Sequence, residues 1–61
     1  MKIKHYREKR GMIQETLALK LDVDRSTIAK WETSEAMPRA DKLPEIAKVL
    51  GCTINDLFGE E

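Results

Sequence analysis

The sequence is poor in the residues that build several classes of protein. Among its 61 residues there are one cysteine, two prolines, three glycines and three aromatic residues. One cysteine cannot form a disulfide within the chain, and the lack of a disulfide framework fits a reducing cytoplasm. No apolar run approaches the roughly 20 residues of a membrane span, and no signal-peptide core is visible. The sequence therefore excludes a disulfide-stapled secreted fold and predicts a cytoplasmic protein with no membrane partner.

The sequence also lacks the patterns of enzymes and metal sites. It has no nucleophile–base pair and no glycine-rich phosphate loop. Its one histidine, His5, has no His, Cys or acidic partners at ligand spacing. We expect no catalytic residue, no metal and no cofactor. A length of 61 residues predicts one domain over residues 1–61, with no room for a separate sensor domain.

The chain has no net charge, which at first argues against a nucleic-acid partner. However, the 11 basic and 11 acidic residues are unevenly distributed. Residues 1–30 hold eight Lys or Arg and four Asp or Glu, a balance of +4, whereas residues 31–61 hold three and seven, a balance of −4. This asymmetry indicates a basic face and an acidic back.

The most informative stretch, residues 14–32, predicts two short helices joined by a tight turn. Leu17 and Leu21 stand four residues apart, so they share one face of the first helix. Asp22 then favours a turn through local hydrogen bonds. Asp24 is expected to cap the start of the second helix, where its carboxylate also meets the positive end of the helix dipole.

The second helix of the pair, Arg25–Glu32, is expected to have one buried and one polar face. Ile28 and Trp31, three residues apart, point to the core. At 100° per residue, the opposite arc holds four residues that suit contact with DNA bases: Arg25, Ser26, Ala29 and Lys30. Arg can bond guanine O6 and N7 together, Ser and Lys can reach base edges, and Ala allows close approach. This is the layout of a helix-turn-helix whose second helix enters the major groove.

Two further helices flank this pair. One is expected over residues 2–10 and ends at Gly11. The other starts near Asp41, tolerates a proline in its first turn and ends at Gly51. Its core stripe follows the i, i+3, i+4, i+7 pattern: Leu43, Ile46, Ala47 and Leu50.

A fifth short helix is expected near the end of the sequence. Thr53 and Asp56 have the spacing of a capping box that opens it, and Gly59 ends it, with residues 60–61 frayed. Cys52 just before it is expected to be a buried thiol. Three residues of this segment are too apolar for a free tail: Ile54, Leu57 and Phe58.

Together these features resemble the phage-repressor and Cro-like helix-turn-helix family. The resemblance is carried by GMIQETLALKLDVDRSTIAKWE, then Pro38, LPEIA at 43–47 and VLG at 49–51, and it covers about residues 3–58. It implies an all-α fold: a compact bundle of five short helices, lambda-repressor-like, with the helix-turn-helix at helices 2 and 3. The chain departs from the family at two positions. Asp22 replaces a usual glycine at a turn position that often needs positive φ, and Ile13 replaces a usual Ser or Thr cap.

The resemblance also implies a function and site residues. The expected function is sequence-specific binding of double-stranded DNA by a transcriptional regulator, a repressor acting as a homodimer on a palindromic operator. Arg7 is expected to form a structural ion pair with Glu32. The expected dimer interface is Ile54, Leu57 and Phe58, and the expected contacts to the DNA backbone are Gln14, Thr27, Thr33, Ser34 and Arg39.

Two alternatives remain at this stage. The chain could be a protein-interaction module, such as an antitoxin-like subunit whose partner docks on Leu19 or the last helix. It could also keep a helix-turn-helix only as a scaffold, but the hydrogen-bonding side chains of the second helix argue against that.

Overall fold

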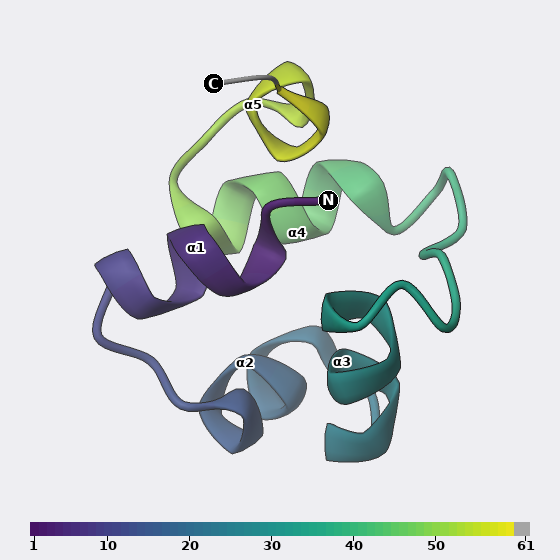
Figure 1. The fold of residues 1–61 in the computed structure, drawn as a ribbon. Coiled ribbons are helices and arrows are strands. Elements are labelled where there is room, and N and C mark those ends of the chain that lie inside the picture. Colours follow the sequence, from purple (N-terminus) through teal and green to yellow (C-terminus); the bar gives the residue numbers. More distant parts are fainter. Residues whose placement is uncertain (60–61) are drawn as a thin grey trace.

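The computed structural model describes residues 1–59, which form five helices and no strand. The predicted all-α fold of five short helices is therefore confirmed, while the prediction for residues 60–61 lies outside the described part. Figure 1 shows α2 and α3 packed together at one end of the molecule and α5 at the other. The helices are α1 (Ile3–Lys9), α2 (Gln14–Leu21), α3 (Arg25–Glu32), α4 (Leu43–Leu50) and α5 (Ile54–Phe58).

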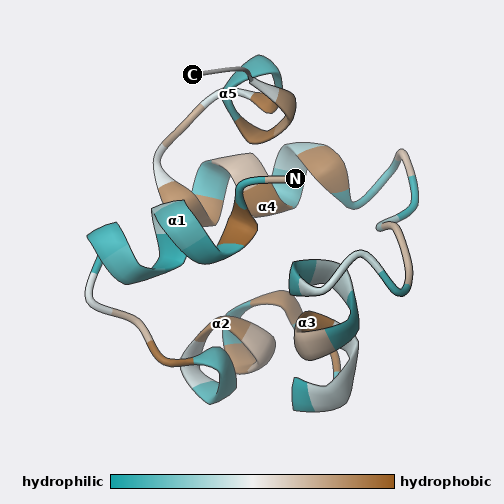
Figure 2. Ribbon diagram, in the orientation of Figure 1, coloured by the Kyte–Doolittle hydropathy of each residue, from teal (hydrophilic) through white to brown (hydrophobic). Residues whose placement is uncertain are grey.

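One apolar core lies between the helices, as the inward brown segments in Figure 2 show. Helix α2 packs against α3 and α4, and α1 packs against α3 and α4. The helices bury faces whose residues stand three and four apart, because such residues align on a helix. Leu43 is the exception in the predicted stripe of α4: as the first residue of the helix it is only half-buried and lies outside the core. The core residues are Ile3, Leu17, Ala18, Leu21, Ile28, Trp31, Ile46, Ala47, Leu50 and Leu57.

The turn between α2 and α3 depends on a left-handed residue. Asp22 follows α2 with φ 59° and ψ 47°, so the aspartate at this position does adopt the positive φ that the turn requires. The backbone N–H of Val23 then donates to the carbonyl of Ala18 at 3.0 Å. Asp is among the residues that tolerate this conformation best after glycine. The turn fixes where α3 begins and hence where its polar face points.

The starts of the helices differ from one another in capping. Thr53 and Asp56 form the predicted capping box, with reciprocal side-chain bonds of 3.0 Å to the backbone N–H groups. Ile13 precedes α2 without a side-chain cap among the described residues, as expected. The prediction for Asp24 was half wrong: it occupies the N-cap position of α3 with extended backbone, yet within residues 1–59 its side chain makes no cap hydrogen bond.

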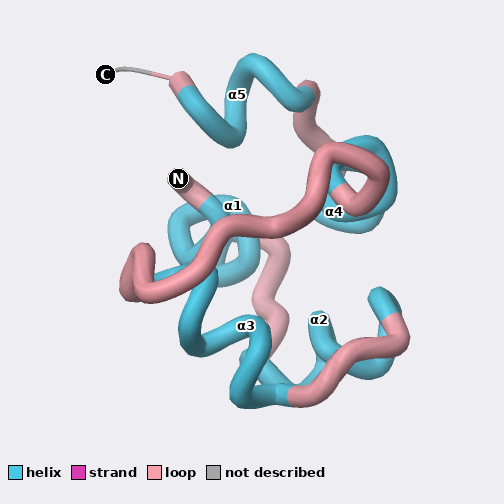
Figure 3. The backbone as a smooth tube through the Cα atoms, turned by 90° about the vertical axis from the view of Figure 1, so that its right-hand side faces the viewer, coloured by secondary structure: helices cyan, strands magenta, loops and turns pink. Residues whose placement is uncertain are grey.

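Helix α4 begins at Leu43, two residues later than predicted. The preceding residues form tight turns instead, since Lys42 N–H donates to the carbonyl of Arg39 at 2.9 Å and Leu43 N–H to that of Ala40 at 3.3 Å. The loop from α3 to α4 is the longest connection, and Figure 3 shows it running from the end of α3 to the start of α4. Ser34 in this loop has a positive φ of 66°.

The last helix closes the core from the side of the N-terminus, as Figure 1 shows. The N–H of Lys2 donates to the carbonyl of Leu57 at 2.8 Å, and the Leu57 side chain is fully buried. Cys52, predicted to be buried, is only half-buried. Its partial burial raises the pKa of the Cys52 thiol above its ordinary value, and the carboxylate of Asp56 adds to this effect.

Candidate nucleic-acid interface

An ion pair between α1 and α3 fixes the C-terminal end of α3. Arg7 Nε donates to Glu32 Oε2 at 2.6 Å, and Arg7 Nη2 donates to Oε1 at 3.1 Å. The two side chains are 9% and 4% exposed. Arg7 Nη1 also donates to the carbonyl of Met12 at 2.7 Å. These bonds to Glu32 raise the pKa of Arg7, although its burial opposes the rise. The predicted structural pair is present.

Gln14 connects this ion pair to the polar face of α3. Its Nε2 donates to Glu32 Oε1 at 3.1 Å, and its Oε1 accepts from Nη1 of Arg25 at 3.2 Å. The partners define the amide orientation, because a carboxylate only accepts and a guanidinium only donates. The structure therefore brings two predicted site residues, Gln14 and Arg25, into contact. A chain of hydrogen bonds runs from Arg7 through Glu32 and Gln14 to Arg25.

The polar face of α3 is open to solvent along its length. Arg25, Ser26 and Lys30 are exposed, and Ala29 is half-buried between them. Ile28 and Trp31 lie on the opposite side, in the core. The helix is eight residues long, and the two cationic side chains stand near its two ends. The four predicted base-contacting residues thus form one continuous surface strip, with a short side chain where close approach is needed.

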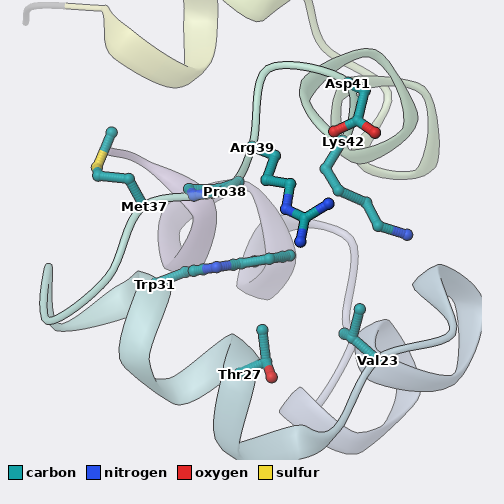
Figure 4. A pocket seen from close by; sticks show the side chains of 8 residues that line it. All are labelled: Val23, Thr27, Trp31, Met37, Pro38, Arg39, Asp41 and Lys42. Atoms are coloured by element: carbon teal, nitrogen blue, oxygen red, sulfur yellow. The ribbon is translucent and has the colours of Figure 1, made fainter.

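Beside this strip, α3 and the loop that follows it form a hollow of about 280 Å³. Figure 4 shows Thr27 from α3 and Arg39 from the loop lining it, with the indole of Trp31 as part of its wall. The structure thus brings together two residues that were predicted to contact the DNA backbone. Arg39 is exposed and makes no ion pair within residues 1–59.

Lys42 also lines this hollow, and no sequence pattern predicted it. Its Nζ donates to the carbonyl of Leu21 at 3.2 Å and to Glu45 Oε1 at 3.2 Å. The first of these bonds satisfies a carbonyl at the end of α2 and attaches the loop to the helix-turn-helix. Lys42 is 21 residues from Leu21 in the chain, so no local spacing could have indicated this contact.

Thr33 and Ser34 follow the end of α3 and are exposed. The hydroxyl of Thr33 lies 3.3 Å from the carbonyl of Lys30 and 3.4 Å from Glu35 Oε1. A hydroxyl has one proton, so it can donate to only one of these oxygens at a time. Glu35 beside this hydroxyl places a negative charge at the position where a phosphate was expected.

Within residues 1–59, no three His, Cys, Asp or Glu side chains gather in a group that could hold a metal ion. None of the helices in this part of the chain is long and apolar enough to cross a membrane.

Comparison with known proteins assigns this chain to a family. A model of the helix-turn-helix family matches residues 3–57. The chain belongs to the phage-repressor and Cro-like helix-turn-helix family of transcriptional regulators. This confirms the resemblance drawn from the sequence, and the family is one of transcriptional regulators rather than of enzymes. No solved structure matches the chain significantly.

Curated relatives come from bacteria, phages and archaea. The HTH-type transcriptional activator BcrR of Enterococcus faecalis is 38% identical over 61 residues, which are 98% of this chain and 30% of that protein. The 26 kDa repressor protein of Escherichia phage HK022 is 44% identical over 46 residues, 75% of this chain and 20% of the repressor. An uncharacterized HTH-type transcriptional regulator of Methanocaldococcus jannaschii is 40% identical over 57 residues, 93% of this chain and 86% of that protein. The chain thus spans less than a third of the first two relatives and most of the third.

Proposed function

We propose that this chain binds double-stranded DNA in a sequence-specific manner and regulates transcription, with α3 in the major groove. The observation that carries the proposal is the strip formed by Arg25, Ser26, Ala29 and Lys30, which is exposed on a helix whose other face is in the core. A major groove admits one α-helix and presents a distinct pattern of donors and acceptors for each base pair. As one domain in the cytoplasm, the chain would have direct access to DNA there.

In this arrangement Arg25 contacts a base edge, most favourably a guanine, because its guanidinium can donate to O6 and N7 together. Gln14 holds the other side of the guanidinium through its 3.2 Å contact with Nη1. Lys30, more than one turn further along, contacts a base or a phosphate. Ser26 supplies a donor and acceptor next to Arg25.

Contacts to the DNA backbone flank this strip. Arg39 and Thr27 line one hollow next to α3 and would hold a phosphate on that side. Gln14, Thr33 and Ser34 supply polar groups at the start of α2 and the end of α3. Such contacts set the position of the protein on the duplex without reading its sequence.

We further propose a homodimer on a palindromic operator. Ile54 and Phe58 are 39% and 48% exposed, so α5 offers an apolar surface to a second copy. Leu57, which was also assigned to the interface, lies in the core of its own chain and cannot contribute a surface. Two recognition helices in a symmetric dimer would reach half-sites about 34 Å apart, one helical turn, or a multiple of that spacing.

Selection of binding sites from random double-stranded DNA tests this function. We expect a preferred palindrome with two half-sites, and ultracentrifugation should show two chains on one selected duplex. Recovery of unrelated sequences would contradict sequence-specific binding. One chain per duplex would contradict the dimer alone.

The second candidate function is a protein-interaction module of the antitoxin type. Its support is Leu19, which is 77% exposed on α2, together with the apolar side chains exposed on α5. A regulator can also bind a protein partner, so this function adds to DNA binding rather than replacing it. A chain that selects no DNA sequence would favour it.

A further inference from the structure

We propose that an acidic protein segment docks in a second hollow, which is not formed by α3. In this segment one apolar side chain is flanked by carboxylates. The hollow has a volume of about 430 Å³ and is lined by Arg10, Met12, Lys20 and Val49. These residues come from the end of α1, the connection after it, α2 and α4. No residue of α3 or of the loop after it lines the hollow, so this site differs from the proposed DNA-binding surface. We call it the basic hollow.

The charges at its rim lack partners among residues 1–59. Arg10 and Lys20 are exposed, and neither forms an ion pair or a side-chain hydrogen bond within the described residues. Among the residues that the structure describes, none of those lining the basic hollow is acidic. Two positive charges beside one cavity repel each other and attract carboxylates, which favours an anionic partner and speeds its approach.

The Arg10 side chain lies over a glycine, Gly51. The guanidinium occupies the space that a Cβ would take at Gly51, which ends α4 with φ 71°. Gly51 therefore both ends the helix and leaves room for the guanidinium to pack against the backbone. In this position the charge of Arg10 lies beside the apolar floor, and the side chain is exposed.

The floor of the basic hollow is apolar. Met12 and Val49 are half-buried and pack against the core, so part of each side chain still faces water. An apolar side chain inserted between the two cations would remove this surface from water, and methionine adapts easily to such a contact. A phosphate backbone offers no apolar group for this floor. A protein segment therefore fits better than nucleic acid.

The basic hollow is also too open to enclose a small molecule. All four lining residues keep contact with solvent, whereas sites for small ligands bury most of the ligand surface. A protein segment does not need to be enclosed, because the fold of the partner protein keeps the segment in shape. Only one of its apolar side chains and the neighbouring carboxylates would contact the hollow. This partner would bind while α3 remains free for DNA.

A blocked synthetic peptide with one leucine between two pairs of glutamates serves as the probe. Titration should give saturable shifts of the Met12 and Val49 methyl resonances. The variant Arg10→Gln/Lys20→Gln should bind about tenfold more weakly, since it removes two exposed charge contacts. The variant Lys4→Gln/Lys48→Gln, which removes two exposed cations outside the hollow, should bind as the parent does. If the Arg10 variant fails to fold, Lys20→Gln alone should weaken binding about threefold.

Control peptides separate charge from apolar contact. Replacing the glutamates by glutamines, or the leucine by serine, should each weaken binding several-fold. The proposal is overturned if no saturable shift occurs, if the shifts lie on other residues, or if both double variants lose binding equally. It is also overturned if Arg10→Gln/Lys20→Gln weakens DNA binding as Arg39→Ala does, because the cations would then hold phosphate. The peptide titration needs no DNA, so its failure leaves the proposed function intact.

Discussion

Glu32, at the end of α3, receives two hydrogen bonds from Arg7 of α1, at 2.6 and 3.1 Å. Both side chains are almost fully buried, and the carboxylate also accepts from Gln14. A guanidinium and a carboxylate match each other in this two-bond geometry, which fixes direction as well as distance. The pair therefore sets how α3 sits against the rest of the molecule.

Replacing Glu32 by Ala should lower the free energy of unfolding by about 3 kcal/mol, because it leaves the Arg7 charge buried without its partner. The exposed pair of Lys42 and Glu45, at 3.2 Å, provides the control. Glu45→Ala should cost less than about 1 kcal/mol, since solvent screens that pair. Urea denaturation of both variants measures the difference. Equal costs would show that the pair of Arg7 and Glu32 is no more than a surface contact.

Replacing Gln14 by Ala should reduce sequence discrimination as well as affinity. The side-chain amide of Gln14 forms hydrogen bonds with Arg25 and with Glu32, so loss of the amide leaves the Arg25 guanidinium free to move. The ratio of affinities for matched and mismatched sites should fall at the base pair that Arg25 is proposed to contact. Thr33→Ala serves as the control and should leave this ratio unchanged. If Gln14→Ala weakens all sequences alike, Gln14 acts only as a backbone contact.

Replacing Asp22 by Gly should stabilise the fold by about 0.5–1 kcal/mol. Asp22 has φ 59°, a conformation that costs free energy for every residue with a Cβ. Greater freedom of glycine in the unfolded chain offsets part of this gain. Asp22→Val should instead destabilise, because β-branched residues adopt positive φ least readily. Thermal unfolding of the two variants should move in opposite directions, and a loss of stability in both would contradict the argument.

The pKa of the Cys52 thiol is raised chiefly by burial and also by Asp56, which gives a prediction for alkaline pH. The folded chain retains the thiol proton more strongly than the unfolded chain does. The stability that depends on this proton is therefore complete below the unfolded pKa and is lost as pH rises through the folded pKa. Unfolding titrations of the parent and of Cys52→Ala should diverge above the ordinary thiol pKa, with the parent losing more stability. Parallel curves would refute the shift.

Much of the fold follows from local patterns in the sequence. Gln14 does open α2, Asp22 does adopt positive φ, and Thr53 and Asp56 do form a capping box. Each of these features depends on residues within a few positions of one another. Over such short distances, residue spacing and backbone preference determine the local structure. The start of α4 was placed two residues early because a proline in its first turn suits either start.

The contacts between distant parts of the chain were harder to predict. The pair of Arg7 and Glu32 was expected only from the family resemblance, since 25 residues separate them. The bonds of Gln14 and of Lys42 were not expected at all, because only the packed helices bring their partners close. Asp24 had the right position for a cap but its side chain does not form the bond within the described residues. Side-chain partners depend on tertiary packing, which local propensity does not contain.

Arg25 is expected to read a base, whereas Arg39 is expected to hold the DNA backbone. Binding titrations on the selected site and on single-base mismatches, at several salt concentrations, distinguish these two roles. Arg25→Ala should lose roughly 1–3 kcal/mol on the preferred site and relax the preference at one base position. Arg39→Ala should weaken binding to all sequences similarly and lower the salt slope by about one unit. If Arg25→Ala instead weakens every sequence equally, Arg25 does not read a base and the role assigned to α3 is wrong.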